Sequence, residues 1–188
     1  MTEPARAPHV VGLDPSLTAA AIAHSSGRLH LTGTKNLTSP IKGLVWRSQG
    51  LRALGDDIVK CTLAEGMPDL VVPEMLPRAG TRFDPERGYL WWYIIDALVT
   101  RGVPVLDGVA VATIKKYAVG KGNAGKPAMI EATVRRLPQY QTGGDDNLCD
   151  AVWAMALGRE MLGHPLVELP AVNRSALAKL VLPGGVHR

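Results

Sequence analysis

Apolar residues recur in three short segments near the start of the chain, at residues 9–14, 17–25 and 29–37. Pro15 follows the first run, and a turn at residues 26–27 separates the second from the third. Short apolar segments bounded by turn residues are typical of β-strands joined as hairpins. The pattern therefore predicts an antiparallel meander of three strands at the start of the chain.

The rest of the pattern alternates between helical and extended segments. Leu51, Leu54, Ile58 and Cys61 recur at helical spacing and predict a helix over residues 43–65. Three hairpin strands followed by alternating helices and strands predict an α/β domain, with a five-stranded mixed sheet flanked by helices. The further strands are expected at 68–74 and 103–106, and the further helices at 84–102, 111–119, 127–137 and 145–162.

The chain has 188 residues, of which 46% are hydrophobic and 20% charged, and this suits one globular domain. We expect that domain over residues 1–163, followed by a Pro- and Gly-rich tail over 164–188 with no firm structure. No apolar run approaches the ~18–20 residues of a membrane span, and the N-terminus lacks the apolar stretch of a signal peptide. Cys61 and Cys149 fit no metal spacing. These features predict a cytoplasmic protein without a membrane partner.

Two acidic residues end apolar strands in the same way. Asp14 closes the run HVVGLD, and Glu74 closes the run PDLVVPE. A buried, unpaired carboxylate costs several kcal/mol or more, so each residue requires a partner such as a cation or a metal ion. If the two strands pair, both carboxylates lie at the same edge of the sheet, where α/β proteins bind ligands.

The predicted helix 145–162 carries further acids. Asp145 or Asp146 suits its N-cap. Asp150 shares one stripe with the apolar residues four, seven and eleven positions later, and Asp146 lies one turn before it on nearly the same side. That stripe is the face expected to point toward the sheet.

Four converging carboxylates would repel one another unless a cation binds between them. Mg²⁺ prefers oxygen ligands, and two such ions can clamp a phosphodiester during attack by water. Asp14, Glu74, Asp146 and Asp150 are therefore the candidate ligands for Mg²⁺, with Mn²⁺ as a substitute. The alternative interpretation is a set of separate caps and surface acids.

Positive charge is concentrated between residues 111 and 137. This segment has six basic residues and one acid, whereas the whole chain has a net charge of only +4 and a pI of about 9.2. Such a cluster indicates an anionic partner, nucleic acid first, or else a solvated helix face. The loop GKGNAGK at 120–126 has the outline of a nucleotide-binding P-loop, but Pro127 replaces the Ser or Thr that would bind Mg²⁺. A cradle for a DNA backbone fits it better.

The motifs GLDPS, LVVPE, GKGNAGK and DDNLCDA, in this order, resemble the RuvC-type Holliday junction resolvases over residues 9–160. That family has the RNase H-like fold of the retroviral integrase superfamily. The small size and divergence resemble its phage-borne branch, which would place the protein in a host cytoplasm. The resemblance implies a Mg²⁺-dependent endonuclease that acts as a homodimer and nicks two opposing strands of a four-way DNA junction.

The resemblance also assigns roles by position. Asp14, Glu74 and Asp150 match acidic metal ligands, and Lys115 and Lys126 match lysines before and after the glycine loop that face the phosphate. Many members have an acid or His three residues before the last Asp, where this chain has Asn147. We expect Asp146 to act instead, with Asn147 as a neutral alternative. The candidate catalytic and DNA-binding set is Asp14, Glu74, Asp146, Asp150, Lys115, Lys126, Lys116, Lys121 and Arg78.

The aromatic residue that the family uses to part bases is replaced here by Pro77. Phe83 or Arg78 are the candidates to substitute for it. Trp91 and Trp92 lie in an aromatic helix that suits the core or a dimer interface better than base stacking.

Two other functions remain open on the sequence alone. The first is a nuclease for forks, flaps or RNA–DNA hybrids. The second is a non-catalytic DNA-binding protein on the same fold. The histidines at 24, 30, 164 and 187 show no ligand spacing and are interpreted as surface or structural residues.

Overall fold

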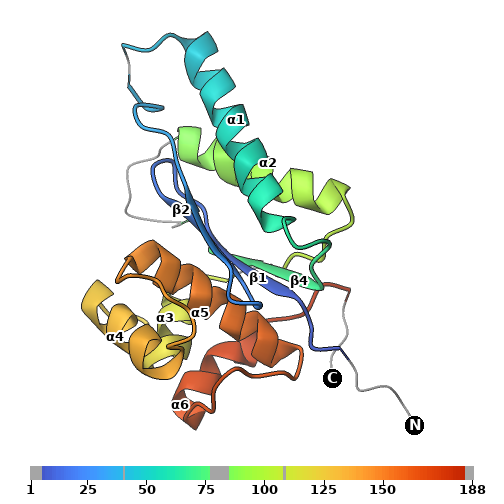
Figure 1. Cartoon of the computed structure of the whole chain (residues 1–188), viewed down its shortest axis with the longest axis vertical. Helices are drawn as coiled ribbons and strands as arrows, with labels where there is room; N and C mark the ends of the chain where they lie inside the picture. The colour runs from blue at the N-terminus through green and yellow to red at the C-terminus, as the bar shows by residue number, and fades with distance from the viewer. Residues whose placement is uncertain (1–5, 40, 77–84, 108, 185–188) are drawn as a thin grey trace.

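Residues 6–39, 41–76, 85–107 and 109–184 are described by a computed structural model, in which a mixed sheet lies between two layers of helices (Figure 1). β1 (Val10–Asp14), β2 (Ala20–His24) and β3 (Leu29–Thr32) form the predicted antiparallel meander. β4 (Leu70–Pro73) pairs with β1 in parallel, which gives the strand order β3-β2-β1-β4. The predicted α/β class is confirmed.

The predicted fifth strand at 103–106 is wrong as a strand, and the described sheet has four. This segment makes one parallel bridge, between Val105 and Val71. The N–H of Val71 donates to the carbonyl of Pro104, and the N–H of Leu106 donates to Val71, both at 2.8 Å. Since proline has no N–H, Pro104 cannot contribute a donor of its own to a longer ladder.

The two faces of the sheet belong to two separate cores. Val11, Leu13 and Ile22 point to one side, where α1 (Leu44–Thr62) and α2 (Pro85–Thr100) pack. Their neighbours on the same strands, including Val10, Ala21 and Ala23, point to the other side. Figure 1 shows α1 and α2 above the sheet and the remaining helices below it.

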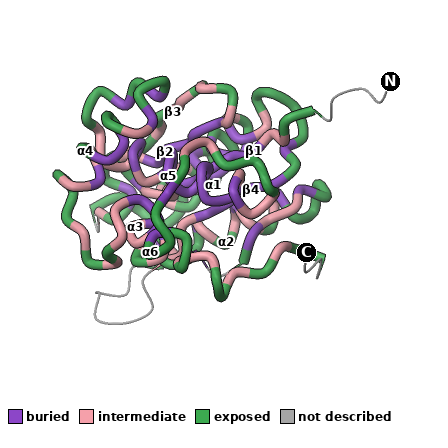
Figure 2. The backbone as a smooth tube through the Cα atoms, turned by 90° about the horizontal axis from the view of Figure 1, so that it is seen from below, coloured by how far each residue is buried: buried purple, intermediate pink, exposed green. Residues whose placement is uncertain are grey.

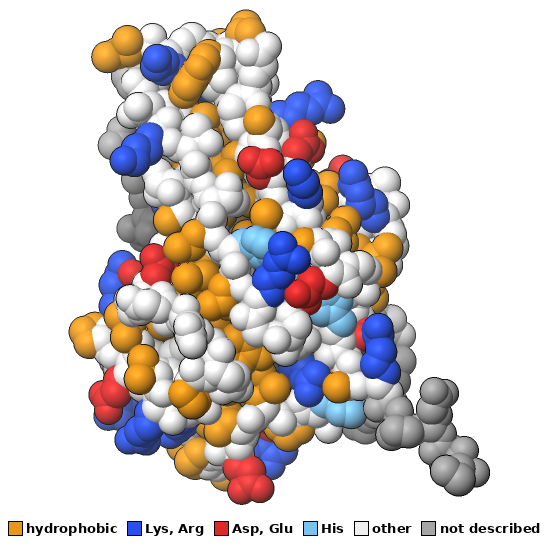
Figure 3. All heavy atoms as spheres, in the orientation of Figure 1, with side chains coloured by type: hydrophobic (Ala, Val, Ile, Leu, Met, Phe, Trp, Pro, Cys, Tyr) orange, Lys and Arg blue, Asp and Glu red, His pale blue; other side chains and the backbone are white. Residues whose placement is uncertain are grey.

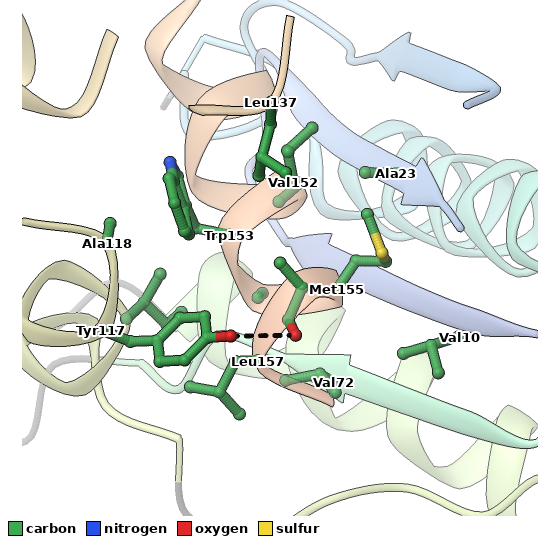
Figure 4. Close-up of a cluster of buried hydrophobic side chains, with 14 of the residues drawn as sticks. Val10, Ala23, Val72, Tyr117, Ala118, Leu137, Val152, Trp153, Met155 and Leu157 are labelled. Carbon is green, nitrogen blue, oxygen red and sulfur yellow. Dashed lines mark hydrogen bonds between the residues drawn. The ribbon is translucent and has the colours of Figure 1, made fainter. Parts of the chain in front are cut away.

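α5 (Asp146–Met161) is the central helix of the lower layer. It is buried over nearly its whole length, as the purple segment labelled α5 in Figure 2 shows, because β1, β2 and two helices surround it. Those helices are α3 (Val111–Val119) and α4 (Lys126–Arg136). Figure 4 shows Trp153 and Tyr117 filling the space between α5 and α3, where the rings meet edge to face. This packing fixes the position of α5 relative to the sheet and α3.

The segment after residue 164 was expected to lack structure, and this expectation is wrong for residues 171–179. It forms α6 (Ala171–Arg174) and a 3₁₀ turn, η1 (Ser175–Lys179), both packed on α3. Asn173 is buried and donates from Nδ2 to the carbonyl of Tyr117 at 2.8 Å. Arg174 at the end of α6 pairs with Glu160 of α5.

None of the helices in the described residues has the length and apolar character of a membrane span.

Candidate active site

Asp14 and Glu74 leave neighbouring strands at the same edge of the sheet. β1 and β4 run in parallel, with Leu13 opposite Pro73, and the N–H of Glu74 donates to the carbonyl of Leu13 at 2.8 Å. The next residue on each strand is therefore the acid. Both acids are partly buried. The structure thus brings together the two strand-end carboxylates that the sequence singled out.

α5 adds Asp150 to this pair because it lies directly on the backbone of β1. A Cβ atom at Gly12 would stand 2.0 Å from the carbonyl oxygen of Ala151 and 2.5 Å from the nitrogen of Met155. No side chain fits in that space, so glycine is required for the helix to approach so closely. Asp150 directly precedes the contacting residue Ala151. The helix starts as predicted, with Asp145 as N-cap accepting the N–H of Leu148 at 3.0 Å.

The pKa values show how strongly the carboxylates affect one another. Burial, followed by the charges of Asp150 and Asp146, raises the pKa of Asp14 to about 7. Burial and the charge of Asp14 raise the pKa of Glu74 to about 8. Burial also raises the pKa of Asp150 to about 6, although the nearby charge of Lys115 opposes the rise. Acids perturbed in this way, by burial together with like charges, are characteristic of functional sites.

Two oxygens in this cluster have no partner of their own. Glu74 Oε2 and Asp150 Oδ1 are buried and accept no hydrogen bond from the described residues. Buried polar atoms are nearly always paired, and an unpaired one requires an explanation. A divalent cation between the acids would give both oxygens a partner and offset the repulsion, and an all-oxygen donor set suits Mg²⁺ or Mn²⁺ by its chemistry.

Three cations surround the acids. The charge of Lys115, on α3, lowers the pKa values of Glu74 and Asp150. Lys126, at the start of α4, forms an ion pair with Asp146 at 2.5 Å. The charge of Arg87, in the first turn of α2, lowers the pKa of Asp14. Sequence reasoning missed Arg87, since it stands in no acidic or glycine motif and reaches the site only through the packing of α2.

Asp146 and its neighbour Asn147 differ in charge and in partners. Asp146 raises the pKa values of both Asp14 and Asp150, so its charge is felt at the cluster. Its side chain also meets Lys126. Asn147 is neutral and partly buried. The charge of Asp146 thus acts on the cluster, and the choice of Asp146 rather than Asn147 as the fourth ligand stays a prediction.

The glycine loop links α3 to α4 beside the acids. Gly120 ends α3 in the left-handed conformation, with φ 84°, and donates its N–H to the carbonyl of Lys116. The segment before the loop is helical, as predicted, whereas a P-loop requires a strand there. Lys121 is exposed in the loop. Arg78, Pro77 and Phe83, which the sequence offered for DNA binding or for parting bases, lie outside the described residues.

The two tryptophans of α2 have different surroundings. Trp91 is partly buried, and its indole N–H donates to the carbonyl of Glu74 at 2.9 Å. Trp92 is 66% exposed. The expected packing role fits Trp91, which contacts the backbone of a candidate ligand.

Two solved structures share the architecture that positions these residues. The Thermus thermophilus RuvC structure superposes with a TM-score of 0.56, over 83% of this chain and 97% of that chain, at 18% sequence identity. T. thermophilus RuvC in complex with Holliday junction substrate superposes with a TM-score of 0.55, over 92% and 95%, also at 18% identity. The fold is that of RuvC. No family model matches the sequence, and neither does any curated protein.

The RuvC fold confirms the resemblance that the motifs predicted, at the level of the fold. At this identity the superposition shows the architecture alone. The sheet and α5 are thus arranged as in the RNase H-like fold. The phage origin stays a prediction.

Proposed function

We propose that this protein is a divalent-metal-dependent endonuclease that resolves four-way DNA junctions by paired, symmetric nicks. The observation that carries the proposal is the cluster of Asp14, Glu74 and Asp150, in which two buried oxygens find no partner in the part of the chain that the structure describes. A cluster of acids beside DNA would repel the phosphates unless metal ions lie between them. The similarity to RuvC in complex with Holliday junction substrate supports a branched DNA as the substrate.

Asp14, Glu74 and Asp150 are the proposed ligands of Mg²⁺, with Asp146 as the fourth and Mn²⁺ as a substitute. Bound there, the metal would supply Lewis-acid polarisation of the phosphodiester and activation of water for hydrolysis. The raised pKa values of the three buried acids mean that metal binding must compete with protons below about pH 7.

The cations have two proposed roles. Lys115 lies close enough to affect the pKa values of Glu74 and Asp150, and there its charge opposes the negative charge that develops on the phosphate. Lys126 is 73% exposed and is free to exchange Asp146 for a phosphate oxygen. Arg87 offers a third positive charge near Asp14.

Lys116, Lys121 and Arg78 are the proposed contacts to the DNA backbone further from the acids. Lys116 lies in the last turn of α3 and Lys121 in the loop that follows, so both continue the basic side of the site. Contacts of this kind fix the register of the duplex arms without reading their sequence.

A homodimer is part of the proposal, since two opposing strands need two active sites. The outer face of α2 exposes Tyr89, Trp92 and Val99, three large apolar side chains on one helix. A second copy related by a two-fold axis would cover them. Equilibrium sedimentation of the wild type and of Trp92→Glu tests this, and an unchanged monomer in both would contradict it.

The decisive experiment is cleavage of end-labelled DNA in Mg²⁺ and in Mn²⁺. The substrates are a mobile four-way junction, a fork, a flap, an RNA–DNA hybrid and a plain duplex. Asp14→Asn should abolish cutting and leave junction binding intact. Asp57→Asn, which removes an exposed acid of α1, is the matched control and should cut normally.

Symmetric nicks confined to the four-way junction are the expected result. Cutting of forks, flaps or hybrids at similar rates would replace the resolvase by a broader branched-nucleic-acid nuclease. Binding of the junction without cutting in either metal would leave a non-catalytic DNA-binding protein. Normal cutting by Asp14→Asn would overturn the assignment of the site.

A further inference from the structure

A second group of metal-type ligands lies at the opposite end of β1 from Asp14. His9 directly precedes β1, His24 ends β2, and Glu65 follows α1. The antiparallel register places Val11 opposite His24, which brings the start of β1 to the end of β2. Figure 3 shows histidine and acidic side chains on one face of the molecule, whereas the side chain of His24 is fully buried beneath the surface.

The three ligand atoms form a small triangle. His9 Nε2 lies 3.1 Å from His24 Nδ1, and Glu65 Oε2 lies 3.8 Å from the first and 3.6 Å from the second. Two ligands that each stand ~2.0–2.1 Å from a zinc ion at tetrahedral angles are about 3.4 Å apart. The triangle therefore has the size needed by three ligands of one ion.

His24 is held in the orientation of a ligand. Its side chain is fully buried, and its Nε2 lies 3.0 Å from the carbonyl oxygen of Cys61. Since a carbonyl only accepts, Nε2 carries the proton, and the lone pair of Nδ1 faces His9 and Glu65. Metal-binding histidines typically donate their other N–H in this way to a carbonyl or carboxylate.

His9 is fixed through its backbone. Its N–H donates to Asp69 Oδ2 at 2.7 Å, and its carbonyl accepts the N–H of Asp69 at 2.8 Å. The ring stacks on that of His24, with centroids 5.4 Å apart, and its one hydrogen bond within the described residues is to His24, in which His9 Nε2 must be the donor. An ion can replace that proton when His9 takes its other neutral tautomer and turns toward Glu65. Binding therefore requires a side-chain rotation and no movement of the sheet.

We propose that His9, His24 and Glu65 bind a divalent transition-metal ion of the zinc type, with water as the fourth ligand. Two imidazoles and one carboxylate suit Zn²⁺, whereas Mg²⁺ prefers oxygen ligands alone. Glu65 is 26% exposed, so the ion has a path from solvent. The ion would join the N-terminal segment, β2 and the end of α1, which are otherwise linked here mainly by hydrogen bonds.

His30 supports a polar rather than an inert environment for this ion. Its ring lies edge-on to that of His24, with centroids 5.6 Å apart, and its buried Nε2 has no hydrogen-bond partner among the described residues. The strand length separates this site from the acids, since five residues of β1 at ~3.3 Å each place Asp14 about 16 Å from His9.

The test is titration of the metal-free full-length protein with zinc chloride, in millimolar Mg²⁺ so that the carboxylate cluster is already supplied. Calorimetry gives the stoichiometry, and the visible absorption of Co²⁺ in place of Zn²⁺ reports the ligand field. His9→Ala and Glu65→Gln are the test variants, because both side chains lie near the surface and their loss leaves the core intact. His164→Ala, an exposed histidine, and Asp14→Asn are the controls.

We expect one Zn²⁺ per chain, a higher melting temperature with zinc, and affinity weakened by about 10–100-fold or more in each test variant. Both controls should bind as the wild type does. Absence of zinc binding at micromolar concentrations, or binding that survives His9→Ala, would overturn the site. Loss of binding in Asp14→Asn would assign the zinc to the carboxylate cluster instead.

Discussion

Trp91 on α2 holds the backbone of Glu74 at the end of β4. The indole N–H donates to the carbonyl of Glu74 at 2.9 Å, while the N–H of Glu74 donates to the carbonyl of Leu13 at 2.8 Å. Both backbone polar groups of Glu74, its N–H and its carbonyl, are thus held by hydrogen bonds. A carboxylate that must stay beside Asp14 despite their repulsion gains most from a backbone held in this way.

Replacement of Trp91 by phenylalanine should therefore impair cleavage more than binding. The aromatic bulk remains, but a hydrogen bond worth about 1 kcal/mol is lost and Glu74 gains freedom. We expect kcat to fall about 10-fold, as ~1.4 kcal/mol in the barrier produces, with little change in junction affinity. Trp92→Phe, at an exposed position, is the control. Equal effects of the two substitutions on kcat would contradict the positioning role.

Without divalent metal, the protein should lose stability as the pH rises. The folded-state pKa values are about 7 for Asp14, 8 for Glu74 and 6 for Asp150, all above the ordinary values of 3.8 and 4.5. The folded state therefore binds more protons than the unfolded state between about pH 4 and 8. Its stability from these groups is complete below pH 4 and is lost as the pH rises through 6 to 8.

Urea denaturation in chelator, from pH 5 to pH 8, measures this loss, which at about 1.4 kcal/mol per pKa unit amounts to several kcal/mol in the free energy of unfolding. Glu74→Gln should flatten the profile and stabilise the metal-free protein at pH 8, although it abolishes cleavage. Glu131→Gln, an exposed acid of α4, should leave the profile unchanged. A wild-type profile that is flat, or that rises with pH, would show that the acids do not share a buried site.

The acids could be found from the sequence because each is a charged residue at a position where the pattern predicts an apolar one. Asp14 and Glu74 end apolar strands, and Asp150 lies in the apolar stripe of a helix, so periodicity alone marks them. Arg87 and Trp91 carry no such mark. They reach the site through the angle at which α2 packs on the sheet, and no spacing along the chain encodes that angle.

Gly12 should be among the positions of the sheet least tolerant of substitution. The Cβ of alanine would overlap the backbone of Ala151 and Met155, atoms that cannot move without shifting α5 from β1. We expect Gly12→Ala to destabilise by about 3 kcal/mol or more, in the range of overpacked cores, and to abolish cleavage by displacing Asp150. Gly88→Ala, where nothing lies within 4 Å of the added Cβ, should instead be neutral or stabilising by ~0.5–1 kcal/mol. Thermal melting of both variants measures this difference, and equal melting temperatures would contradict the close packing of α5 on Gly12.

The C-terminal segment is expected to be part of the fold. Asn173 donates to the carbonyl of Tyr117 from a buried position, and Tyr117 in turn donates to Glu160 at 2.8 Å. Asn173→Ala leaves that carbonyl unpaired and should cost about 1–3 kcal/mol in chemical denaturation. Ser175→Ala, which removes an exposed hydroxyl, is the control and should cost far less. An Asn173→Ala protein as stable as the control would show that the segment around Asn173 contributes little to the stability of the fold.

The sequence could not predict this docking, because one buried amide on a single helical turn has no periodicity. The same holds for His9, His24 and Glu65, which come from three different elements. The fifth strand failed for the opposite reason. Its apolar pattern, VPVL, was that of a strand, and the missing N–H of Pro104 limited it to one bridge.

Lys115 and Lys121 should separate catalysis from DNA binding. Lys115 affects the pKa values of Glu74 and Asp150, so its charge acts where the phosphate reacts. Lys115→Ala should lower the cleavage rate of bound junction by about 10²-fold or more, as removal of a group that stabilises developing charge does. Lys121 is exposed in the loop between α3 and α4. Lys121→Ala should weaken junction binding and reduce the slope of log K against log salt by about one, with the single-turnover rate unchanged.

The control is Lys60→Ala, in α1 on the opposite layer, which should change neither the cleavage rate nor the junction affinity. If Lys115→Ala altered only the salt slope, Lys115 would be a backbone contact like Lys121, and charge stabilisation at the scissile phosphate would fall to Lys126 and Arg87.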